Sequence, residues 1–311
     1  MKLQKAAEAA FCAALPFVSQ GRVASYIPEL AKSDPDKLGL CIYSADYQKI
    51  WIGDASQRFT IQSICKVISL AVALHHFGFE KVFSLVGMEP SGDSFNSIIK
   101  LDTTSNLPFN PMINCGAIEV ASILSNAFTF NQMLELTRTL CMDSSIVLDE
   151  TVYNSERSTG DRNRAIAYLL SSKGVLAGEE AESLDLYFKL CSLSVTTQSL
   201  AGLGLILSTG GIDPYNGQRL LSRRVVQTIK SLMFTCGMYD GSGEFAVKVG
   251  LPAKSGVGGG IVACTNNGLG IGCYGPALDD KGNSIGGIQI LRSLSESLNL
   301  HMMDSEKNGL T

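Results

Sequence analysis

Histidine is scarce in this chain, and its scarcity limits the chemistry available. The sequence contains three histidines, of which His75 and His76 are adjacent. Adjacent residues on a helix point about 100° apart, so this pair cannot easily bind one metal ion. We therefore expect no metal and no cofactor. We also expect the base of any serine chemistry to be a lysine or a tyrosine, because a Ser-His-Asp triad needs a histidine.

Long apolar runs and basic blocks are missing as well. No run approaches the roughly 20 residues that span a bilayer, and the net charge is −4. We expect no membrane span and no nucleic-acid partner. The composition, 45% hydrophobic and 17% charged over 311 residues, is that of a globular protein with one or two domains.

The cysteines show no paired framework. There are nine, an odd number, and none forms a C-x-x-C motif. Reduced thiols in a cytoplasmic protein are the simplest interpretation. The alanine-rich residues 6–18 faintly resemble a signal peptide, but Glu8 interrupts them and Pro16 ends them. We predict an amphipathic first helix there.

Strand patterns occur near both ends of the chain, with helical patterns between them. Residues 38–43 and 50–52 predict a hairpin, and Asn266-Asn267-Gly268 is a typical turn between strands 260–264 and 269–274. A further strand is predicted at 245–249. Helices are predicted at 117–125, 130–141, 163–171, 179–191, 199–208, 223–235 and 288–298.

This order of elements predicts an α/β (α+β) fold with one sheet formed from both termini and an inserted helical domain. We assign residues 1–60 and 240–311 to the sheet domain and 61–239 to the helical domain, with the active site between them.

The most informative motif is Ser63-Ile64-Cys65-Lys66, at the start of an apolar helical run. Side chains three residues apart lie on one face of a helix. A serine hydroxyl needs a neighbouring base or cation to act as a nucleophile, and Lys66 can supply either. Alternatively, Ser63 has only a structural role and caps the N-terminus of the helix. A second match, Ser97 to Lys100, lies in a polar, turn-rich segment and is the weaker candidate.

Two glycine-rich segments follow far downstream. Lys254-Ser255-Gly256 resembles the strand that lines the pocket of serine acyl-enzymes. Gly270 to Gly275 match G-x-G-x-x-G, but they lie within a predicted strand, and Pro276 stands where a helix should begin. We therefore predict no dinucleotide site.

Several longer motifs in a fixed order resemble the serine-dependent glutaminases, whose fold is similar to that of β-lactamases and penicillin-binding proteins. The resemblance runs from about residue 20 to residue 300. Its motifs are Gly21-Arg22-Val23-Ala24-Ser25-Tyr26-Ile27-Pro28-Glu29-Leu30, Phe59-Thr60-Ile61-Gln62-Ser63-Ile64-Cys65-Lys66, Pro108-Phe109-Asn110-Pro111-Met112-Ile113-Asn114-Cys115-Gly116-Ala117-Ile118, Ser155-Glu156, Thr159-Gly160-Asp161-Arg162-Asn163, and Pro252-Ala253-Lys254-Ser255-Gly256-Val257-Gly258-Gly259-Gly260.

The resemblance implies hydrolysis of L-glutamine to L-glutamate and ammonia through a γ-glutamyl ester on Ser63. Lys66 and Tyr239 would be its catalytic partners, and either could be the general base. The pocket strand would be Lys254, Ser255 and Gly256, and the oxyanion would lie between the backbone N–H groups of Ser63 and Val257. The implied substrate-binding residues are Tyr26, Gln62, Asn114, Glu156, Asn163, Tyr187, Tyr239 and Val257.

Glu156 would pair with the α-ammonium of the substrate, and Asn114 and Asn163 would donate to its carboxylate. Cys65 stands where the family more usually has serine, and Cys115 where we expect alanine. The resemblance also implies a homodimer or homotetramer.

Other functions remain open at this point. A different acyl-enzyme of the β-lactamase or transpeptidase type would share the serine, the lysine and the Lys-Ser-Gly strand, but has less need of an acid such as Glu156. A catalytically silent binding protein on the same fold is the other alternative. Glu156 could also be a surface acid paired with Arg157 or Arg162.

Overall fold

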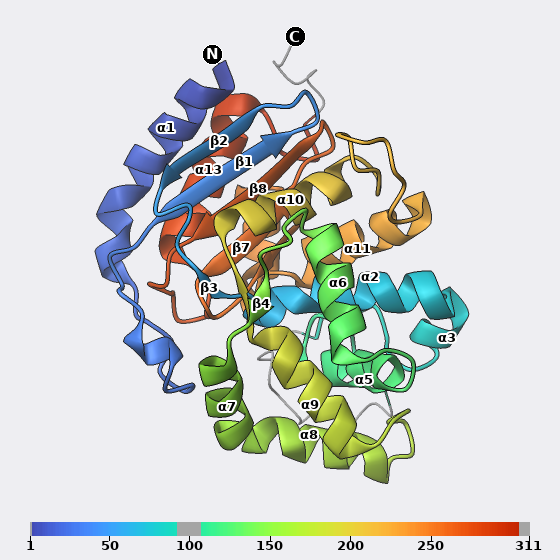
Figure 1. The fold of residues 1–311 in the computed structure, drawn as a ribbon. Helices are drawn as coiled ribbons and strands as arrows, with labels where there is room; N and C mark the ends of the chain where they lie inside the picture. Colours follow the sequence, from blue (N-terminus) through green and yellow to red (C-terminus); the bar gives the residue numbers. More distant parts are fainter. Residues whose placement is uncertain (1, 92–106, 305–311) are drawn as a thin grey trace.

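The computed structural model describes residues 2–91 and 107–304. Its main sheet is antiparallel, is formed from both ends of the chain and has the order β2-β1-β8-β7-β6 (Figure 1). The predicted mixed fold class is confirmed. The strands are β1 (Gly39–Ser44), β2 (Lys49–Gly53), β6 (Ala253–Ser255), β7 (Gly260–Cys264) and β8 (Leu269–Tyr274).

Both predicted hairpins are present. In the first, Gly39 to Tyr43 pair with Gly53 to Lys49, and in the second, Gly260 to Cys264 pair with Tyr274 to Gly270. Gly268 ends the second turn with φ of +90°, a conformation that glycine adopts without steric cost. Strand β1 also pairs with β8, which joins the N-terminal hairpin to the C-terminal one.

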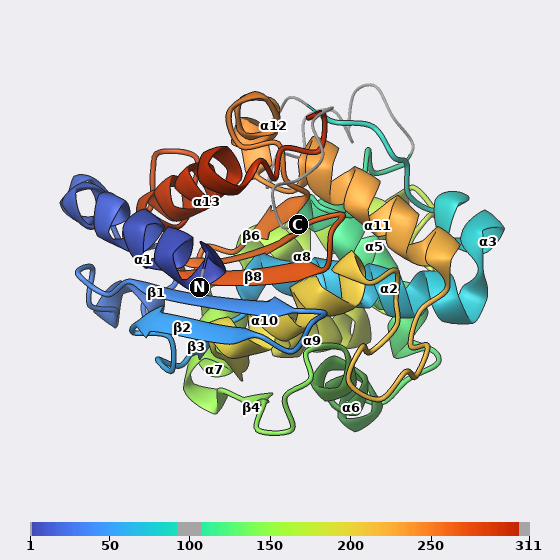
Figure 2. The same cartoon turned by 90° about the horizontal axis from the view of Figure 1, so that it is seen from above.

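Helices cover both faces of this sheet (Figure 2). On one face, α1 (Lys2–Ala14) packs beside α13 (Ile285–Leu298). The buried residues of α1 are Leu3, Ala7, Ala10 and Ala14, three or four apart, as expected for the predicted amphipathic helix. On the other face, α10 (Thr197–Ser208) packs against β8, β7 and β1.

The glycines of β8 allow this close packing of α10. A Cβ added at Gly270 would lie 2.0 Å from the amide nitrogen of Leu205, and one at Gly272 would lie 2.1 Å from the carbonyl oxygen of Thr197. Side chains there would collide with the helix backbone. The G-x-G pattern therefore serves helix–sheet packing, and its predicted place within a strand is confirmed.

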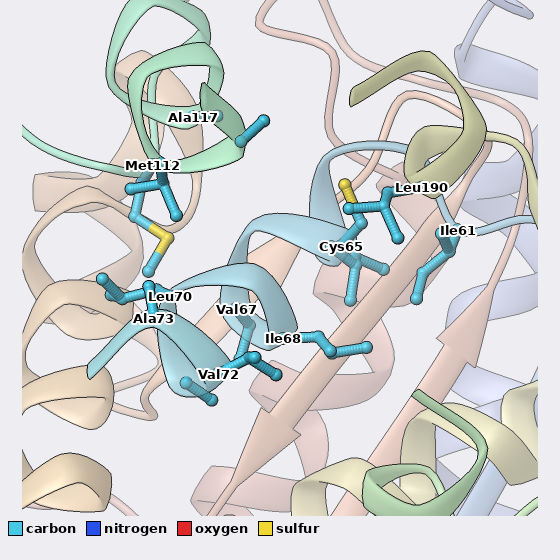
Figure 3. Close-up of a cluster of buried hydrophobic side chains, with 14 of the residues drawn as sticks. Ile61, Cys65, Val67, Ile68, Leu70, Val72, Ala73, Met112, Ala117 and Leu190 are labelled. Atoms are coloured by element: carbon cyan, nitrogen blue, oxygen red, sulfur yellow. The ribbon is translucent and has the colours of Figure 1, made fainter. Parts of the chain in front are cut away.

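The remaining helices form a second apolar core around α2 (Cys65–Phe77), whose first ten residues are all buried. Figure 3 shows Met112 beside Leu70 and Ala73 of α2, and Leu190 beside Cys65. The other helices are α3 (Phe79–Phe83), α5 (Asn114–Ser125), α6 (Phe130–Leu140), α7 (Glu150–Thr159), α8 (Asp161–Ser172), α9 (Glu180–Cys191) and α11 (Arg223–Cys236). Three short strands pair in the order β3-β5-β4, namely β3 (Phe59–Thr60), β5 (Leu193–Val195) and β4 (Val147–Leu148).

One predicted strand is wrong, and the helices α3 and α7 were not predicted. Residues 245–249 belong mostly to helix α12 (Ser242–Lys248), where Glu244 and Lys248 form an i,i+4 ion pair of 2.7 Å and Val247 is 78% exposed. Short apolar runs do not distinguish a strand from a helix. Helix α7 was missed because its sequence is mostly polar, although Asp149 caps it by accepting from the amides of Thr151 and Val152.

The division into a sheet domain and a helical domain stays a prediction, and α10 was assigned to the helical domain although it packs against the sheet. The second S-x-x-K match, at Ser97, lies outside the described residues. No helix within residues 2–91 and 107–304 is long and apolar enough to cross a membrane.

Candidate active site

A cavity of about 270 Å³ gathers most of the predicted substrate-binding residues. Its walls come from the helices α5, α7, α8 and α9, from the short 3₁₀ helix with Gln62 and Ser63, and from the loop with Tyr26, so segments far apart in the sequence meet there. The lining residues are Tyr26, Ile27, Gln62, Ser63, Asn114, Glu156, Thr159, Gly160, Arg162, Asn163, Tyr187 and Cys191. Tyr26, Gln62, Ser63, Asn114, Glu156, Asn163 and Tyr187 were predicted, and the structure brings them together.

Ser63 lies in the short 3₁₀ helix η3 (Gln62–Ile64), which runs directly into α2. It is 7% exposed and lines the cavity. The residue before it, Gln62, has φ of +49°, a strained conformation for a non-glycine residue. Backbone strain of this kind is often found at functional sites.

Lys66, three residues after Ser63, is fully buried. Its Nζ donates to Asn114 Oδ1 at 2.7 Å and to the carbonyl oxygen of Met112 at 3.4 Å. Burial lowers the pKa of Lys66, because the charged form loses its hydration, while nearby Cys191 and Glu156 oppose that shift. The lysine is thus moved toward the neutral form, which can accept a proton.

Tyr239 begins the 3₁₀ helix η4 (Tyr239–Gly241) and has φ of +52°. Burial raises the pKa of Tyr239 far above its usual value, while hydrogen bonds with the Ser63 side chain and the Val257 backbone act in the opposite direction. Its hydroxyl therefore keeps its proton and lies beside the candidate nucleophile.

Lys254 lies on the far side of the Tyr239 ring, with its Nζ 4.3 Å from the ring centroid. This nitrogen donates to the carbonyl oxygens of Ser255 at 2.7 Å and Gly237 at 3.1 Å. Burial, and then the charge of Lys66, lower the pKa of Lys254 well below its usual value. This shift moves Lys254 toward its neutral form, and its Nζ packs over the Tyr239 ring.

The turn after β6 lies directly against the segment that precedes Ser63. A Cβ at Gly256 would be 2.7 Å from the carbonyl oxygen of Ile61, and one at Gly258 would be 2.5 Å from that of Thr60. Only glycine fits this approach. Val257 is held between these glycines, and Ser255 and Lys254 are fully buried in β6.

Glu156 is 6% exposed, so the interpretation as a surface acid is wrong. Ser192 Oγ donates to its Oε2 at 3.4 Å. Burial raises the pKa of Glu156 to about 7, although contacts with Gln62, Ser192 and Lys66 partly offset the effect. A cation that entered the cavity would favour the carboxylate form.

The two predicted asparagines contact each other. Asn114 Nδ2 donates to Asn163 Oδ1 at 3.0 Å, while Asn114 Oδ1 accepts from Lys66. This network links Lys66 to α8 on the opposite wall. Gly160, between α7 and α8, lets the ring of Phe188 approach closely, because a Cβ there would lie 2.5 Å from that ring.

The two predicted tyrosines differ in exposure. The side chain of Tyr187 is buried in α9, and burial raises the pKa of its hydroxyl. Tyr26 is 57% exposed, but burial of its hydroxyl raises its pKa, with Tyr239 and Glu156 adding to the shift. Because Tyr26 lines the cavity and is still half exposed, it lies at the mouth of the cavity.

Sequence reasoning missed Ile27, Thr159, Gly160, Arg162 and Cys191 as lining residues, and Ser192 as a partner of Glu156. All but Cys191 and Ser192 lie in motifs that carry the resemblance, so their proximity in the sequence to predicted site residues was the available signal. Nothing in the sequence around Cys191 and Ser192 distinguishes them. Among the described residues, no group of three or more His, Cys, Asp or Glu side chains could hold a metal ion.

Comparisons with known proteins agree on one family. A family model described as Glutaminase matches residues 21–303. Glutaminase 2 of Clostridium perfringens is 50% identical over 288 residues, which cover 91% of this chain and 94% of that protein. A solved structure of a probable glutaminase has a TM-score of 0.92 and 36% identity, covering 98% of this chain and 99% of that one.

A covalent complex of a Bacillus subtilis glutaminase is also similar. It contains 5-oxo-L-norleucine formed from 6-diazo-5-oxo-L-norleucine. Its TM-score is 0.86 at 38% identity, covering 97% of this chain and 98% of that one.

Proposed function

The chain belongs to the glutaminase family and hydrolyses L-glutamine to L-glutamate and ammonia, and we propose that Ser63 is the nucleophile of this reaction. The fold is the β-lactamase-like fold of the glutaminases to which the structure is similar. The observation that supports the role of Ser63 is its position, because it opens on the cavity lined by Glu156 and Asn163, has the Tyr239 hydroxyl beside it, and is followed three residues later by the buried Lys66.

In the first step, Ser63 Oγ attacks the side-chain amide carbon of glutamine. The proton of Ser63 passes to the leaving nitrogen, ammonia departs, and a γ-glutamyl ester remains. The oxyanion of the tetrahedral intermediate is bound by the backbone N–H groups of Ser63 and Val257. Water then attacks the ester carbon, which releases glutamate and returns a proton to Ser63.

Lys66 is the general base in this proposal. Its pKa is lowered by burial, whereas that of Tyr239 is raised, so Lys66 can accept the serine proton and Tyr239 can donate one. Tyr239 then protonates the leaving nitrogen and regains its proton from Lys66. Lys254 acts through its contact with the Tyr239 ring.

The polar walls of the cavity bind the amino-acid part of the substrate. Glu156 pairs with the α-ammonium, because an unpaired charge in a buried site costs several kcal/mol. Asn163 and Asn114 donate to the α-carboxylate, and Tyr26, Gln62 and Tyr187 enclose the substrate side chain. A β-lactam or peptide substrate would leave Glu156 unpaired, which favours free glutamine over these alternatives.

We also propose a homodimer or homotetramer in the cytoplasm. All nine cysteines are free thiols in the structure, as expected of a reducing compartment. Light scattering at micromolar concentration tests the assembly, and a monomer alone would reject it.

Ser63→Ala tests the nucleophile. Ammonia release from glutamine should fall by roughly 10³-fold or more, as for loss of other serine nucleophiles, while the circular dichroism spectrum stays that of the parent. Ser97→Ala, the other S-x-x-K serine, is the matched control and should keep near-parental activity. Substantial turnover by Ser63→Ala with an inactive Ser97→Ala would reverse the assignment.

A further inference from the structure

Two cysteines meet at the back of the glutamine cavity. Cys65 is the first residue of α2, and Cys191 is the last residue of α9. Their Sγ atoms are 3.7 Å apart, although 126 positions separate them in the sequence. Both side chains are 2% exposed, and Figure 3 shows Cys65 next to Leu190, the neighbour of Cys191.

We propose that Cys65 and Cys191 are a redox-sensitive pair, which a hydroperoxide converts to a disulfide that inactivates the enzyme. The inactivation rests on the proposed role of Ser63, whereas formation of the disulfide does not.

The geometry brings a disulfide within reach. A disulfide bond is about 2.0 Å long, so the two sulfur atoms must approach by roughly 1.6 Å. The thiols belong to different helices, and they face each other without an intervening side chain, as their mutual hydrogen bond shows. Small rotations of the two side chains, together with a shift of one helix end, would supply the approach.

The bond would act on both halves of the active site. Cys65 lies between Ser63 and Lys66, so movement of its backbone changes the position of the nucleophile relative to its base. Cys191 is followed by Ser192, whose Oγ donates to Glu156. Movement of this helix end would therefore disturb the acid that binds the α-ammonium.

The cavity gives peroxide a route to one member of the pair, because Cys191 is among its lining residues. The Cys191 thiolate attacks a peroxide oxygen, the O–O bond breaks, and a sulfenic acid and one water (or alcohol) form. The Cys65 sulfur then attacks the sulfenic sulfur, and a second water leaves as the S–S bond forms. Two thiols are oxidised by two electrons, and one hydroperoxide is reduced.

Surrounding groups set the rate of this reaction. Burial raises the pKa of Cys191 well above its usual value, with Cys65 and Glu156 adding to the shift and Lys66 opposing it. Because the thiolate is the reactive form, oxidation is slow at neutral pH and accelerates as the pH rises. Glutamate in the cavity should protect Cys191 by blocking the route.

The experiment treats the full-length protein with hydrogen peroxide at pH 7 and pH 9, with and without glutamate. Free thiols are then alkylated, and peptides are mapped by mass spectrometry. We expect a Cys65–Cys191 disulfide that forms faster at pH 9, a loss of at least tenfold in ammonia release, and recovery with dithiothreitol. Glutamate should slow both changes.

Cys65→Ser and Cys191→Ala test the pair, and each is scored against its own untreated activity. Both should lose the part of the inactivation that dithiothreitol reverses. Cys12→Ser, at an exposed site on α1, and Cys273→Ser, buried in β8, are the controls and should respond like the parent. Two target variants keep the test usable if one fails to fold.

The outcomes separate this inference from the proposed function. The disulfide should form equally in Ser63→Ala. That variant is inactive, so the bond is detected there by mass spectrometry and not by activity. Formation of the disulfide can therefore be confirmed even if Ser63 is not the nucleophile. A Cys65–Cys115 bond in place of Cys65–Cys191, a disulfide without loss of activity, or parental sensitivity in Cys65→Ser would each overturn the proposal.

Discussion

At the scale of single residues, the active site is governed by burial of charged groups. Lys66 and Glu156 are almost inaccessible to solvent, and burial moves each toward its neutral form. Neutral Lys66 can accept a proton, which favours its proposed role as general base. For Glu156, burial leaves a carboxyl group that titrates near neutral pH and becomes fully charged when a cation enters.

Glu156 therefore predicts a pH dependence of substrate capture. Its pKa in the free protein is about 7, and only the carboxylate pairs with the α-ammonium. The binding contribution is present above pH 7 and is lost as the pH falls through 7. We expect kcat/KM for glutamine to decline on the acid side with an apparent pKa near 7.

Glu156→Gln should lower kcat/KM by roughly 10²-fold, as when a buried charge pair is broken, and should remove this acid limb. Glutamine acetylated on its α-amine should show little further loss in that variant. Glu150→Gln, an exposed acid on the same helix, is the matched control and should keep the parental profile. If kcat/KM of Glu156→Gln had the parental pH dependence, the proposed pairing of Glu156 with the α-ammonium would be wrong.

At the scale of elements, short irregular segments position the catalytic groups and long helices support them. Ser63 and Tyr239 both lie in 3₁₀ helices next to, or at, residues with positive φ. Helix α5 supplies Asn114 from its first residue and contains a fully buried acid, Glu119, in its second turn. Ser122 Oγ lies 3.3 Å from Glu119 Oε1.

Glu119 predicts a loss of stability as the pH rises. Burial raises its pKa to about 7 in the folded protein, while Ser122, the Ala177 backbone and Lys81 partly oppose the shift. The unfolded chain titrates at the ordinary value, 4.5. Between these two pH values the folded state binds more protons than the unfolded chain. The stability that protonated Glu119 contributes is therefore fully present below about pH 4.5, and it is lost as the pH rises through about 7.

The change amounts to about 3 kcal/mol at most, at 1.36 kcal/mol per pKa unit. Urea unfolding at pH 5 and pH 8 measures it. The free energy of unfolding of Glu119→Gln, relative to the parent, should rise between these pH values. Glu135→Gln, an exposed acid on α6, should show little such change. A relative stability of Glu119→Gln that is the same at both pH values would contradict the assignment.

The helices, strands and turns that could be predicted are those with a strong local sequence pattern. The apolar run after Ser63 and the Asn-Asn-Gly turn carry strong local signals, and both were confirmed. Helix α7 has a capping residue, Asp149, but no apolar periodicity, because its buried face includes Glu156. The two-residue strands β3 and β4 depend on pairing with β5, which no local pattern reveals.

The site residues also fall into those that the sequence indicated and those that it did not. The resemblance indicated Ser63, Lys66 and the polar residues of the pocket, and the structure brings those residues together. Their hydrogen bonds were not predictable, since the contact of Lys66 with Asn114 joins α2 to α5. The Cys65–Cys191 contact joins α2 to α9 and was equally invisible in the sequence.

At the scale of the whole molecule, the two ends of the chain build one sheet and the middle supplies most of the cavity. Strand β6 leads from the sheet into the turn with Val257, and that turn lies on the segment before Ser63. The sheet therefore positions the turn with the proposed oxyanion donor Val257, while α5, α7, α8 and α9 present the groups that we propose recognise the substrate.

The most direct test of this account is the site of covalent modification by 6-diazo-5-oxo-L-norleucine. We predict that peptide mapping after reaction places a single 5-oxo-L-norleucine adduct on Ser63, that glutamate slows its formation, and that Ser63→Ala carries none. An adduct on another residue, with Ser63 unmodified in the inactivated protein, would contradict the assignment of the nucleophile.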